Sequence, residues 1–220
     1  MKSEIVELIG QIRGYLGACA EARGSFAKED RSPVTVADVG VQVLVNRMLR
    51  ASFSRDRVIA EEKSSAVAPA LLEQARALLA GVGARLSEAE FRETVDYRGK
   101  DAGPCWMIDP IDGTKGYLRG EQYAVAIARF DGETPLLGCL VCPNLPFPDL
   151  TSSRVGSVVS WDRDSFPLQA WFGDLADRVE LGRSRPVAQA ILRSVEKEHG
   201  DFSVNDELAR RRWNLAVVEE

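Results

Sequence analysis

The sequence predicts a mixed α/β (α+β) protein in which helices come first and β-strands follow. Apolar residues recur at helical spacing near the N-terminal end, and short β-rich runs dominate the middle of the chain. In addition, 45% of the residues are hydrophobic against 28% charged. This composition supports a folded core and excludes wholesale disorder. With 220 residues, the chain has the length of one large domain or two small ones.

The N-terminal part is expected to form helices. A helix is predicted over 3–22, where apolar residues recur every three or four positions. The residues of this pattern are Ile5, Leu8, Ile9, Ile12, Leu16 and Cys19. A polar stretch closed by Pro33 predicts a loop, and a second helix is expected to begin near Thr35 or Asp38. A third helix is predicted over 71–80.

Short apolar runs predict the strands. The runs 57–60 and 105–108 are each expected to form a strand that ends at acidic residues. The runs 123–130 and 136–142 flank an Asp-Gly pair at 131–132, which predicts a β-hairpin. Weaker strands are expected over 155–161, 168–172 and 188–195, and a weaker helix over 206–213. Glycine, serine and charge dominate 81–103, so no boundaries are assigned there.

Charge and hydropathy exclude several classes of partner. The chain has 28 Lys and Arg against 33 Asp and Glu, a formal charge of -5. Binding to a nucleic-acid backbone needs clustered Lys and Arg, so no nucleic-acid partner is expected. No apolar run approaches the roughly 20 residues of a membrane-spanning helix, and the first residues do not resemble a secretory signal. We therefore expect a cytoplasmic protein without a membrane partner.

The cysteines give little sign of chemistry. Cys139 and Cys142 have the spacing of a CxxC motif, but the residues between them are apolar and lie in a strand-like run. Buried packing is therefore expected in place of a redox or zinc site. The one histidine, His199, lies far away in the sequence.

The segment 106–116 carries the clearest functional signal. An apolar strand runs straight into Asp109 and Asp112, and two acids this close raise one another's pKa unless a cation lies between them. Oxygen ligands with an open side suit Mg²⁺. Glu61, at the end of another strand, would add a third carboxylate to a site for two metals that activates water for phosphoryl transfer.

The spacing alone leaves a plainer interpretation open. Asp, Pro and Gly are ordinary turn residues, so 109–113 could be a turn with solvated acids. Glu61 and Glu62 taken alone would be typical surface charges. Thr114 can cap the helix or turn that follows, and Asp38 could be only a helix N-cap.

Longer strings favour the functional interpretation. Asp109-Pro110-Ile111-Asp112-Gly113-Thr114 resembles the signature of the inositol monophosphatase superfamily, whose members are Mg²⁺-dependent, lithium-sensitive phosphatases. Within it, the chain is most similar to the 3'(2'),5'-bisphosphate nucleotidases. The matching segments, in the family's order, are 32–38, 58–62, 106–125, 142–145 and 194–199.

The resemblance implies a fold. The family forms a layered α/β sandwich, so we expect an antiparallel sheet flanked by helices and a second α/β part that is truncated here. The implied division is an N-terminal metal-binding α+β domain over 1–145 and a partial C-terminal α/β domain over 146–220. Family members continue beyond this length and supply a later aspartate for the second metal. Uncovered apolar surface in an incomplete second part favours self-association.

The resemblance also implies residue roles. The Mg²⁺ ligands would be Glu61, Asp109, Asp112 and the carbonyl group of Ile111. Asp38 and Thr114 would orient and deprotonate the attacking water. The backbone N–H groups of Gly113 and Thr114 would receive the phosphate, and His199 would contact the nucleotide. The substrate would be a small phosphorylated nucleotide, adenosine 3',5'-bisphosphate, which is cleaved to AMP and phosphate.

Alternatives stay open at several positions. Glu62 could lie behind the metal ligands or simply be solvated, and His199 could be an ordinary, partly buried histidine. Lys115 and Arg119 are expected to solvate a loop in preference to screening phosphate, and Trp106 is expected to pack in the core.

Two departures from the family pattern flank the acid pair. Ala60 replaces the usual glycine before it, and Lys63 interrupts the small residues that usually follow it. An inositol phosphate is the alternative substrate, and a catalytically silent family member is the alternative function.

Overall fold

The computed structural model describes residues 3–26, 34–100, 103–146, 155–163, 169–172, 177–180, 190–193 and 216–219. The chain forms two compact units, Met1–Leu181 and Gly182–Glu220. The expected boundary after residue 145 falls near the end of a strand of the first unit. The division into a metal-binding part and a partial second domain stays a prediction.

The helices of the first unit are α1 (Ser3–Phe26), α2 (Val36–Ser52), α3 (Pro69–Gly81), α4 (Glu88–Val95) and α5 (Thr114–Arg119). The first three confirm the helices predicted from apolar spacing. Helix α4 was not predicted, although its capping box, Ser87 with Glu90 three residues later, is a recognisable start signal. Helix α5 was not predicted either, since six residues are too few to show a helical period.

Helix α2 is stabilised by burial more than by its own sequence. It is rich in valine, a residue of modest helix propensity, yet the residues from Ala37 to Asn46 are buried without a gap. The Tyr15 side chain of α1 donates a 2.7 Å hydrogen bond to the carbonyl oxygen of Val36. Its ring packs so closely on Gly40 that a Cβ atom there would lie 2.0 Å from it. Gly40 therefore lets the two helices approach.

One sheet forms the other layer of the first unit. Its strands are β1 (Arg57–Ala60), β2 (Cys105–Asp112), β3 (Ala124–Asp131), β4 (Thr134–Pro146), β5 (Val155–Asp162), β6 (Gln169–Phe172) and β7 (Asp177–Glu180), in that order across the sheet. The expected hairpin is confirmed as β3 and β4, and the expected strands at 155–161 and 168–172 as β5 and β6. Strand β7 was not predicted.

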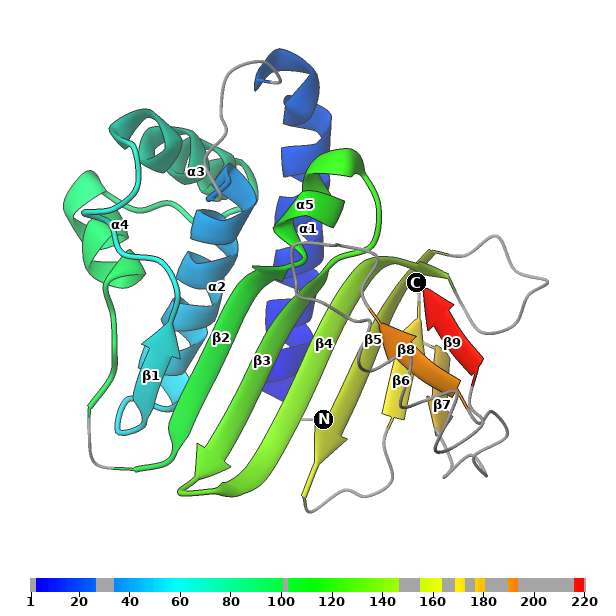
Figure 1. Ribbon diagram of the computed structural model, residues 1–220. Coiled ribbons are helices and arrows are strands. Elements are labelled where there is room, and N and C mark those ends of the chain that lie inside the picture. Colours follow the sequence, from blue (N-terminus) through cyan, green and yellow to red (C-terminus); the bar gives the residue numbers. More distant parts are fainter. Residues whose placement is uncertain are drawn as a thin grey trace. The chain divides into compact units, whose positions relative to one another are not determined.

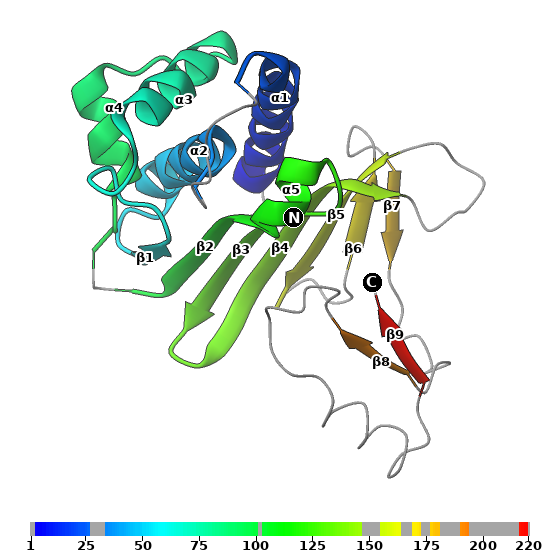
Figure 2. The same ribbon diagram turned by 45° about the horizontal axis from the view of Figure 1, so that its top comes forward.

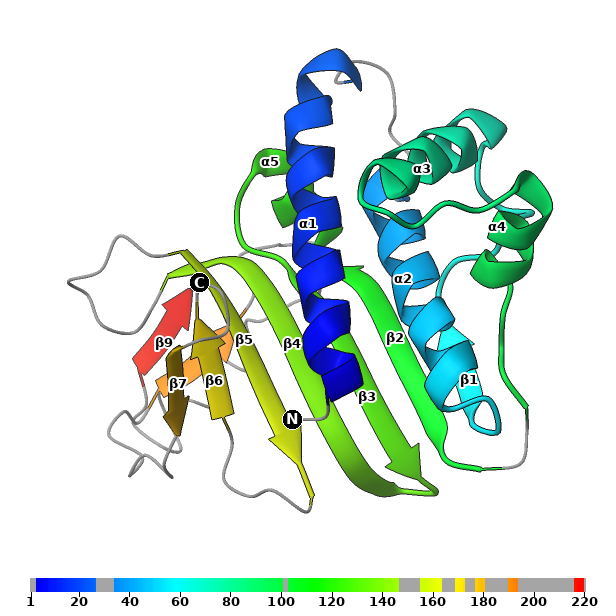
Figure 3. The same cartoon turned by 180° about the vertical axis from the view of Figure 1, so that it is seen from behind.

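The sheet is antiparallel except at one edge. The pair β1 and β2 is parallel, and each later pair is antiparallel. Helices α1 and α2 cover one face of the sheet (Figures 1 and 3), and Figure 2 shows α3 and α4 on the same side. The expected antiparallel sheet flanked by helices is thus confirmed.

Alternation along β2 separates the two faces of the sheet. Trp106 and Ile108 are buried, whereas Met107 is 46% exposed. Ile59 and Leu140, on the same face as Met107, are also exposed. A groove of about 500 Å³ on this face is lined mainly by apolar residues and reaches Asp109.

The second unit is described by two strands. β8 (Ala190–Arg193) pairs in parallel with β9 (Ala216–Glu219). β8 lies within the strand expected over 188–195, and the helix expected over 206–213 lies outside the described residues. None of the helices described is long and apolar enough to cross a membrane.

Candidate functional site

The parallel pairing of β1 and β2 places two acidic segments at one edge of the sheet. Ala60, the last residue of β1, is the partner of Ile108 in β2. Because the strands run the same way, Glu61 and Asp109 follow at the same edge. The pairing of β2 with β3 then shifts between Asp109 and Asp112, where the chain turns toward α5 (Figure 1).

The surroundings of the Asp109 carboxyl group disfavour its ionised form. Partial burial raises its pKa most, and the nearby charges of Glu61 and Asp112 raise it further. A hydrogen bond from the backbone of Ile111 acts in the opposite direction. Three acidic side chains from two strand ends are therefore close enough to repel one another.

Two further carboxyl groups share these surroundings. Burial raises the pKa of Glu62 to about 7, with added contributions from Asp38, Glu61 and Asp109. Burial also raises the pKa of Asp38 to about 6, against hydrogen bonds from Thr35 that lower it. Glu62 is only 5% exposed, so its interpretation as a solvated surface charge is wrong.

Among the described residues, no basic side chain forms a salt bridge with this group of acids. The five carboxylates of the group are Asp38, Glu61, Glu62, Asp109 and Asp112. Within the described segments, no three His, Cys, Asp or Glu side chains converge closely enough to hold a metal ion. The acids therefore interact electrostatically but do not converge on a single ion position. The metal-ligand roles stay predictions.

The donor chemistry nevertheless fits a hard cation. Glu61, Asp109 and Asp112 offer carboxylate oxygens, and the Ile111 carbonyl group adds a neutral oxygen. Mg²⁺ prefers such ligands, and a cation among repelling carboxylates would offset their negative charge. The uncompensated charge is the feature of this structure that suits a divalent ion.

Thr114 and Asp38 are both hydrogen-bonded to near neighbours. The Thr114 hydroxyl group donates to the carbonyl oxygen of Ile111 over 3.1 Å. The Asp38 carboxylate accepts from the backbone N–H of Thr35 at 2.7 Å and from its hydroxyl group. Both residues are described, and no hydrogen bond joins them. The N-cap of α2 is Thr35, and Asp38 is the third helical residue of the capping box, so the interpretation of Asp38 as the N-cap is wrong. A role of Asp38 and Thr114 in activating water stays a prediction.

The turn into α5 depends on glycine. Gly113 has φ 85° and ψ 45°, the left-handed conformation that favours glycine, and it precedes the first residue of α5. The proposed phosphate contact through the N–H groups of Gly113 and Thr114 is untested.

Lys115 and Arg119 lie in α5, so the loop expected there is wrong. Arg119, the last residue of α5, forms a 3.4 Å salt bridge with Glu121. His199 lies outside the described residues.

The CxxC pair agrees with buried packing. Burial raises the pKa of the Cys139 thiol to about 12. Burial, with the charge of Asp112, also raises the pKa of the half-buried Cys142. Neither forms a disulfide bond, and a raised pKa disfavours the reactive thiolate.

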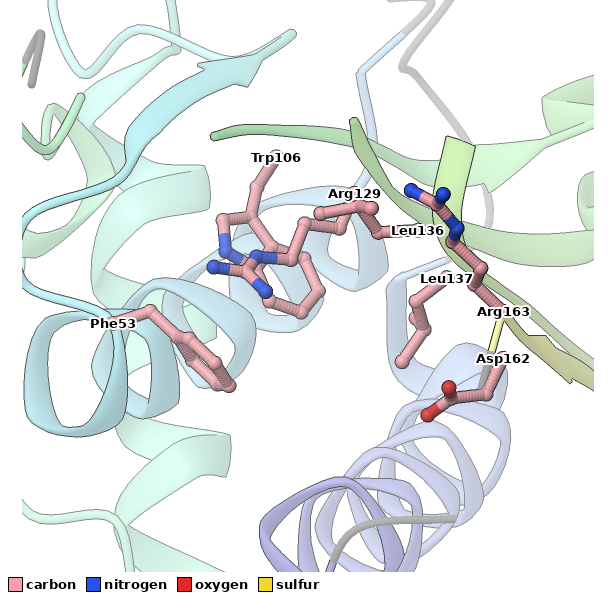
Figure 4. Close-up of a pocket in the computed structure, with 7 residues that line it drawn as sticks. All are labelled: Phe53, Trp106, Arg129, Leu136, Leu137, Asp162 and Arg163. Carbon is pink, nitrogen blue, oxygen red and sulfur yellow. The ribbon is translucent and has the colours of Figure 1, made fainter. Parts of the chain in front are cut away.

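A cavity of about 360 Å³ lies at the opposite end of β2 from the acids. Figure 4 shows the residues that line it. Trp106 lines it and is 1% exposed, which confirms its expected packing in the core. The ring centroids of Trp106 and Phe53 are 4.9 Å apart. The buried Asp56 accepts hydrogen bonds there from the Trp106 indole and the Arg129 guanidinium group, each at 2.9 Å.

One residue beside the acidic side chains was not predicted, namely Gln42 of α2. Its side chain is fully buried and hydrogen-bonded to the backbone of Glu62. The available signal was a polar residue inside an otherwise apolar helix, which native proteins bury only with hydrogen-bond partners.

Known proteins similar to this chain share one family. The sequence profile of the inositol monophosphatase family matches residues 5–170. A 3'(2'),5'-bisphosphate nucleotidase of Emericella nidulans is 35% identical over 163 residues, which cover 66% of this chain and 46% of the relative. A protein of the same name from Schizosaccharomyces pombe is 37% identical over 141 residues, covering 57% of this chain and 40% of the relative.

Solved structures show the same fold. CysQ from Bacteroides thetaiotaomicron, a bacterial member of the family, superimposes with a TM-score of 0.52 at 13% identity. The match covers 98% of this chain and 72% of that one. A staphylococcal IMPase-I with bound products gives a TM-score of 0.55 at 15% identity, covering 100% and 67%. At such identities the likeness concerns the fold alone.

The chain spans about half or less of the length of these two curated relatives. The family profile nevertheless covers more than half of the chain and includes both acidic segments. The fold agrees with this match, and so do the acids at the shared edge of β1 and β2, Glu61, Asp109 and Asp112, here called the acidic edge. The match shows that the chain belongs to the inositol monophosphatase family.

Proposed function

We propose that this protein is a Mg²⁺-dependent phosphomonoesterase that hydrolyses adenosine 3',5'-bisphosphate to AMP and phosphate. The observation that carries the proposal is the group of mutually repelling carboxylates at the shared edge of β1 and β2. The names of the curated relatives support the substrate class. An "IMPase/NADP phosphatase complexed with Mg2+ and phosphate" is among the proteins of this fold, with a TM-score of 0.50.

The proposed metal ligands are Glu61, Asp109, Asp112 and the Ile111 carbonyl group. Mg²⁺, when bound, supplies a Lewis acid that offsets phosphate charge and makes a water molecule more acidic. With a pKa of about 6, Asp38 is mostly ionised at neutral pH and can accept a proton. Thr114 would pass that proton from the water to Asp38.

The reaction needs no covalent enzyme intermediate. The water oxygen bonds to phosphorus as the bond from phosphorus to the ribose 3' oxygen breaks, and that oxygen takes up a proton. The N–H groups of Gly113 and Thr114 would hold the phosphate during the transfer, and His199 would contact the nucleotide. In this proposal residues 1–145 carry the metal site and 146–220 form a partial second domain.

A catalytically weak or silent family member is the second candidate. One observation favours it: no three His, Cys, Asp or Glu side chains converge closely enough to hold a metal ion among the described residues. In that case the chain binds Mg²⁺ weakly and releases little phosphate.

Phosphate release tests both candidates. The 220-residue protein is given adenosine 3',5'-bisphosphate or inositol 1-phosphate, each with Mg²⁺ and with EDTA, beside Asp109→Asn as the matched control. The first candidate predicts that phosphate release depends on Mg²⁺ and is faster with the nucleotide. Asp109→Asn should lower the rate by about 100-fold or more, because losing a metal ligand should cost at least as much activity as losing a group that supports one. Equal rates in wild type and Asp109→Asn would support the silent candidate.

A further inference from the structure

The segment after β1 is held by a buried amide group of α2. Gln42 is 0% exposed. Its Nε2 donates to the carbonyl oxygen of Glu62 at 2.8 Å, and its Oε1 accepts from the backbone N–H of Glu62 at 2.9 Å. A second Nε2 hydrogen bond, also 2.8 Å, goes to the carbonyl oxygen of Val95. The amide group thus pairs with both backbone polar groups of one residue.

Arg98 and Asp96 also hold the segment after β1, at residues 62 and 64. Arg98 donates to the carbonyl oxygen of Glu62 at 2.6 Å and is itself tied to β1, because the N–H of Val58 donates to its carbonyl oxygen at 2.8 Å. The Asp96 carboxylate accepts from the backbone N–H of Ser64 at 2.8 Å and from its hydroxyl group. Glu62 is therefore held by both Gln42 and Arg98, and Ser64 is held by Asp96.

These contacts decide where Glu61 can lie. The residue before it, Ala60, is fixed by its pairing with Ile108 in the sheet. The residue after it, Glu62, is fixed by Gln42. The peptide group that joins Glu61 to Glu62 contains the N–H that Gln42 accepts, so Gln42 restrains the direction in which the exposed Glu61 side chain leaves the sheet edge.

We propose that Gln42 is a positioning residue for the divalent-cation site and acts through Glu61. This inference rests on the proposed function. A metal site needs its ligands within a few tenths of an ångström of the right geometry, and groups behind the ligands provide that restraint. Gln42 touches neither the cation nor the substrate.

Asn46 provides a matched control one turn further along α2. It is also 0% exposed, and its Nδ2 donates to the carbonyl oxygen of Thr94 at 2.8 Å. Its hydrogen bonds reach only the end of α4 and the residues after it, and none goes to residues 61–64. Gln42→Met and Asn46→Leu each remove a buried amide from the same helix, and only the first frees the Glu61 segment.

The test measures the affinity of the full chain of each variant for Mn²⁺ alone. Electron paramagnetic resonance reports the concentration of free Mn²⁺. Mn²⁺ accepts the same oxygen ligands as Mg²⁺. We expect Gln42→Met to weaken binding about tenfold or more and Asn46→Leu to change it by less than about twofold. Unfolding by urea, measured in parallel, shows how much stability each variant loses.

Equal weakening in the two variants, or none in Gln42→Met, would reduce Gln42 to an ordinary core residue. If Gln42→Met does not fold, Gln42→Asn serves instead, because it keeps the amide but is one methylene too short to pair with Glu62. Wild-type protein without saturable Mn²⁺ binding would overturn the proposed function together with this inference. Wild-type binding that Gln42 variants leave unchanged would overturn the inference alone.

Discussion

Carboxylate groups lie at both ends of strand β2, and they differ in whether a basic side chain pairs with them. At its start, the buried Asp56 accepts hydrogen bonds from Trp106 and from Arg129, whose guanidinium group forms a 2.8 Å salt bridge with it. At its far end, Asp109 and Glu62 have raised pKa values, and neither carboxylate forms a salt bridge in the described segments. A buried charge is tolerated when it is paired, and uncompensated acids gathered together point to function.

The paired end is also closed by aromatic rings. The Arg129 guanidinium carbon lies 5.1 Å from the centroid of the Phe53 ring and 5.6 Å from that of Trp106. Figure 4 shows this stack at the wall of the cavity. One end of β2 therefore stabilises the fold, whereas the other gathers acids whose mutual repulsion costs stability, as expected of a ligand site.

The largest expected effect comes from breaking the paired end. Arg129→Met leaves Asp56 buried without its cation, and we expect the free energy of unfolding to fall by about 3–5 kcal/mol. Urea denaturation followed by circular dichroism measures this. The double variant Arg129→Met with Asp56→Asn should recover part of the loss. A loss below about 1 kcal/mol, as for a surface pair, would contradict the comparison.

A smaller effect of opposite sign is expected at the acidic end. Glu62 has its pKa raised from 4.5 to about 7, so in EDTA the wild-type protein should lose stability as the pH rises from about 4.5 to about 7, where the unfolded chain ionises first. Glu62→Gln removes this penalty, and we expect it to be about 1–2 kcal/mol more stable than wild type at pH 8 and similar at pH 4.

Thermal unfolding across this pH range measures the difference. Glu73→Gln is the control, because the exposed Glu73 pairs with Arg76 and its pKa is lowered. It should gain no stability at pH 8. A Glu62→Gln variant that follows the wild-type pH profile would show that the acidic end carries no electrostatic penalty.

The smallest expected effect concerns the start of α2. Thr35→Ala removes the N-cap hydroxyl group, which should cost about 1 kcal/mol of stability. It also removes a hydrogen bond to Asp38, so the pKa of Asp38 should rise above about 6. Ser87→Ala, at the capping box of α4, should cost similar stability and leave Asp38 unchanged. A carboxyl ¹³C titration by nuclear magnetic resonance follows the pKa, and an equal value in both variants would contradict the account.

Local patterns predicted most of the elements and the residues of the acidic edge. Apolar spacing identified α1, α2 and α3, and the Asp-Gly pair identified the hairpin of β3 and β4. The sequence also showed two strands that end in acids, at Glu61 and Asp109. It did not show that these strands are parallel neighbours, which is what places the two acidic segments together.

Contacts between distant residues could not be predicted in the same way. Arg129 and Asp56 are 73 positions apart, and only the folded sheet brings them together. Gln42 interrupts an apolar helix, and its partner is a backbone group 20 positions away, which carries no side-chain signature. Acid spacing at the strand ends suggested the metal role of Glu61, Asp109 and Asp112, and family resemblance alone suggested the water-activating role of Asp38. All of these roles stay predictions.

The most direct test of the acidic edge as a divalent-cation site is thermal unfolding of wild type and Asp109→Asn, each with excess Mg²⁺ and with EDTA. A cation that binds only the folded state, present at a free concentration of 100 times its Kd, raises the free energy of unfolding by about 2.7 kcal/mol. We predict that Mg²⁺ raises the unfolding temperature of wild type by several degrees and leaves that of Asp109→Asn unchanged. The same rise in both proteins, or in neither, would contradict the account.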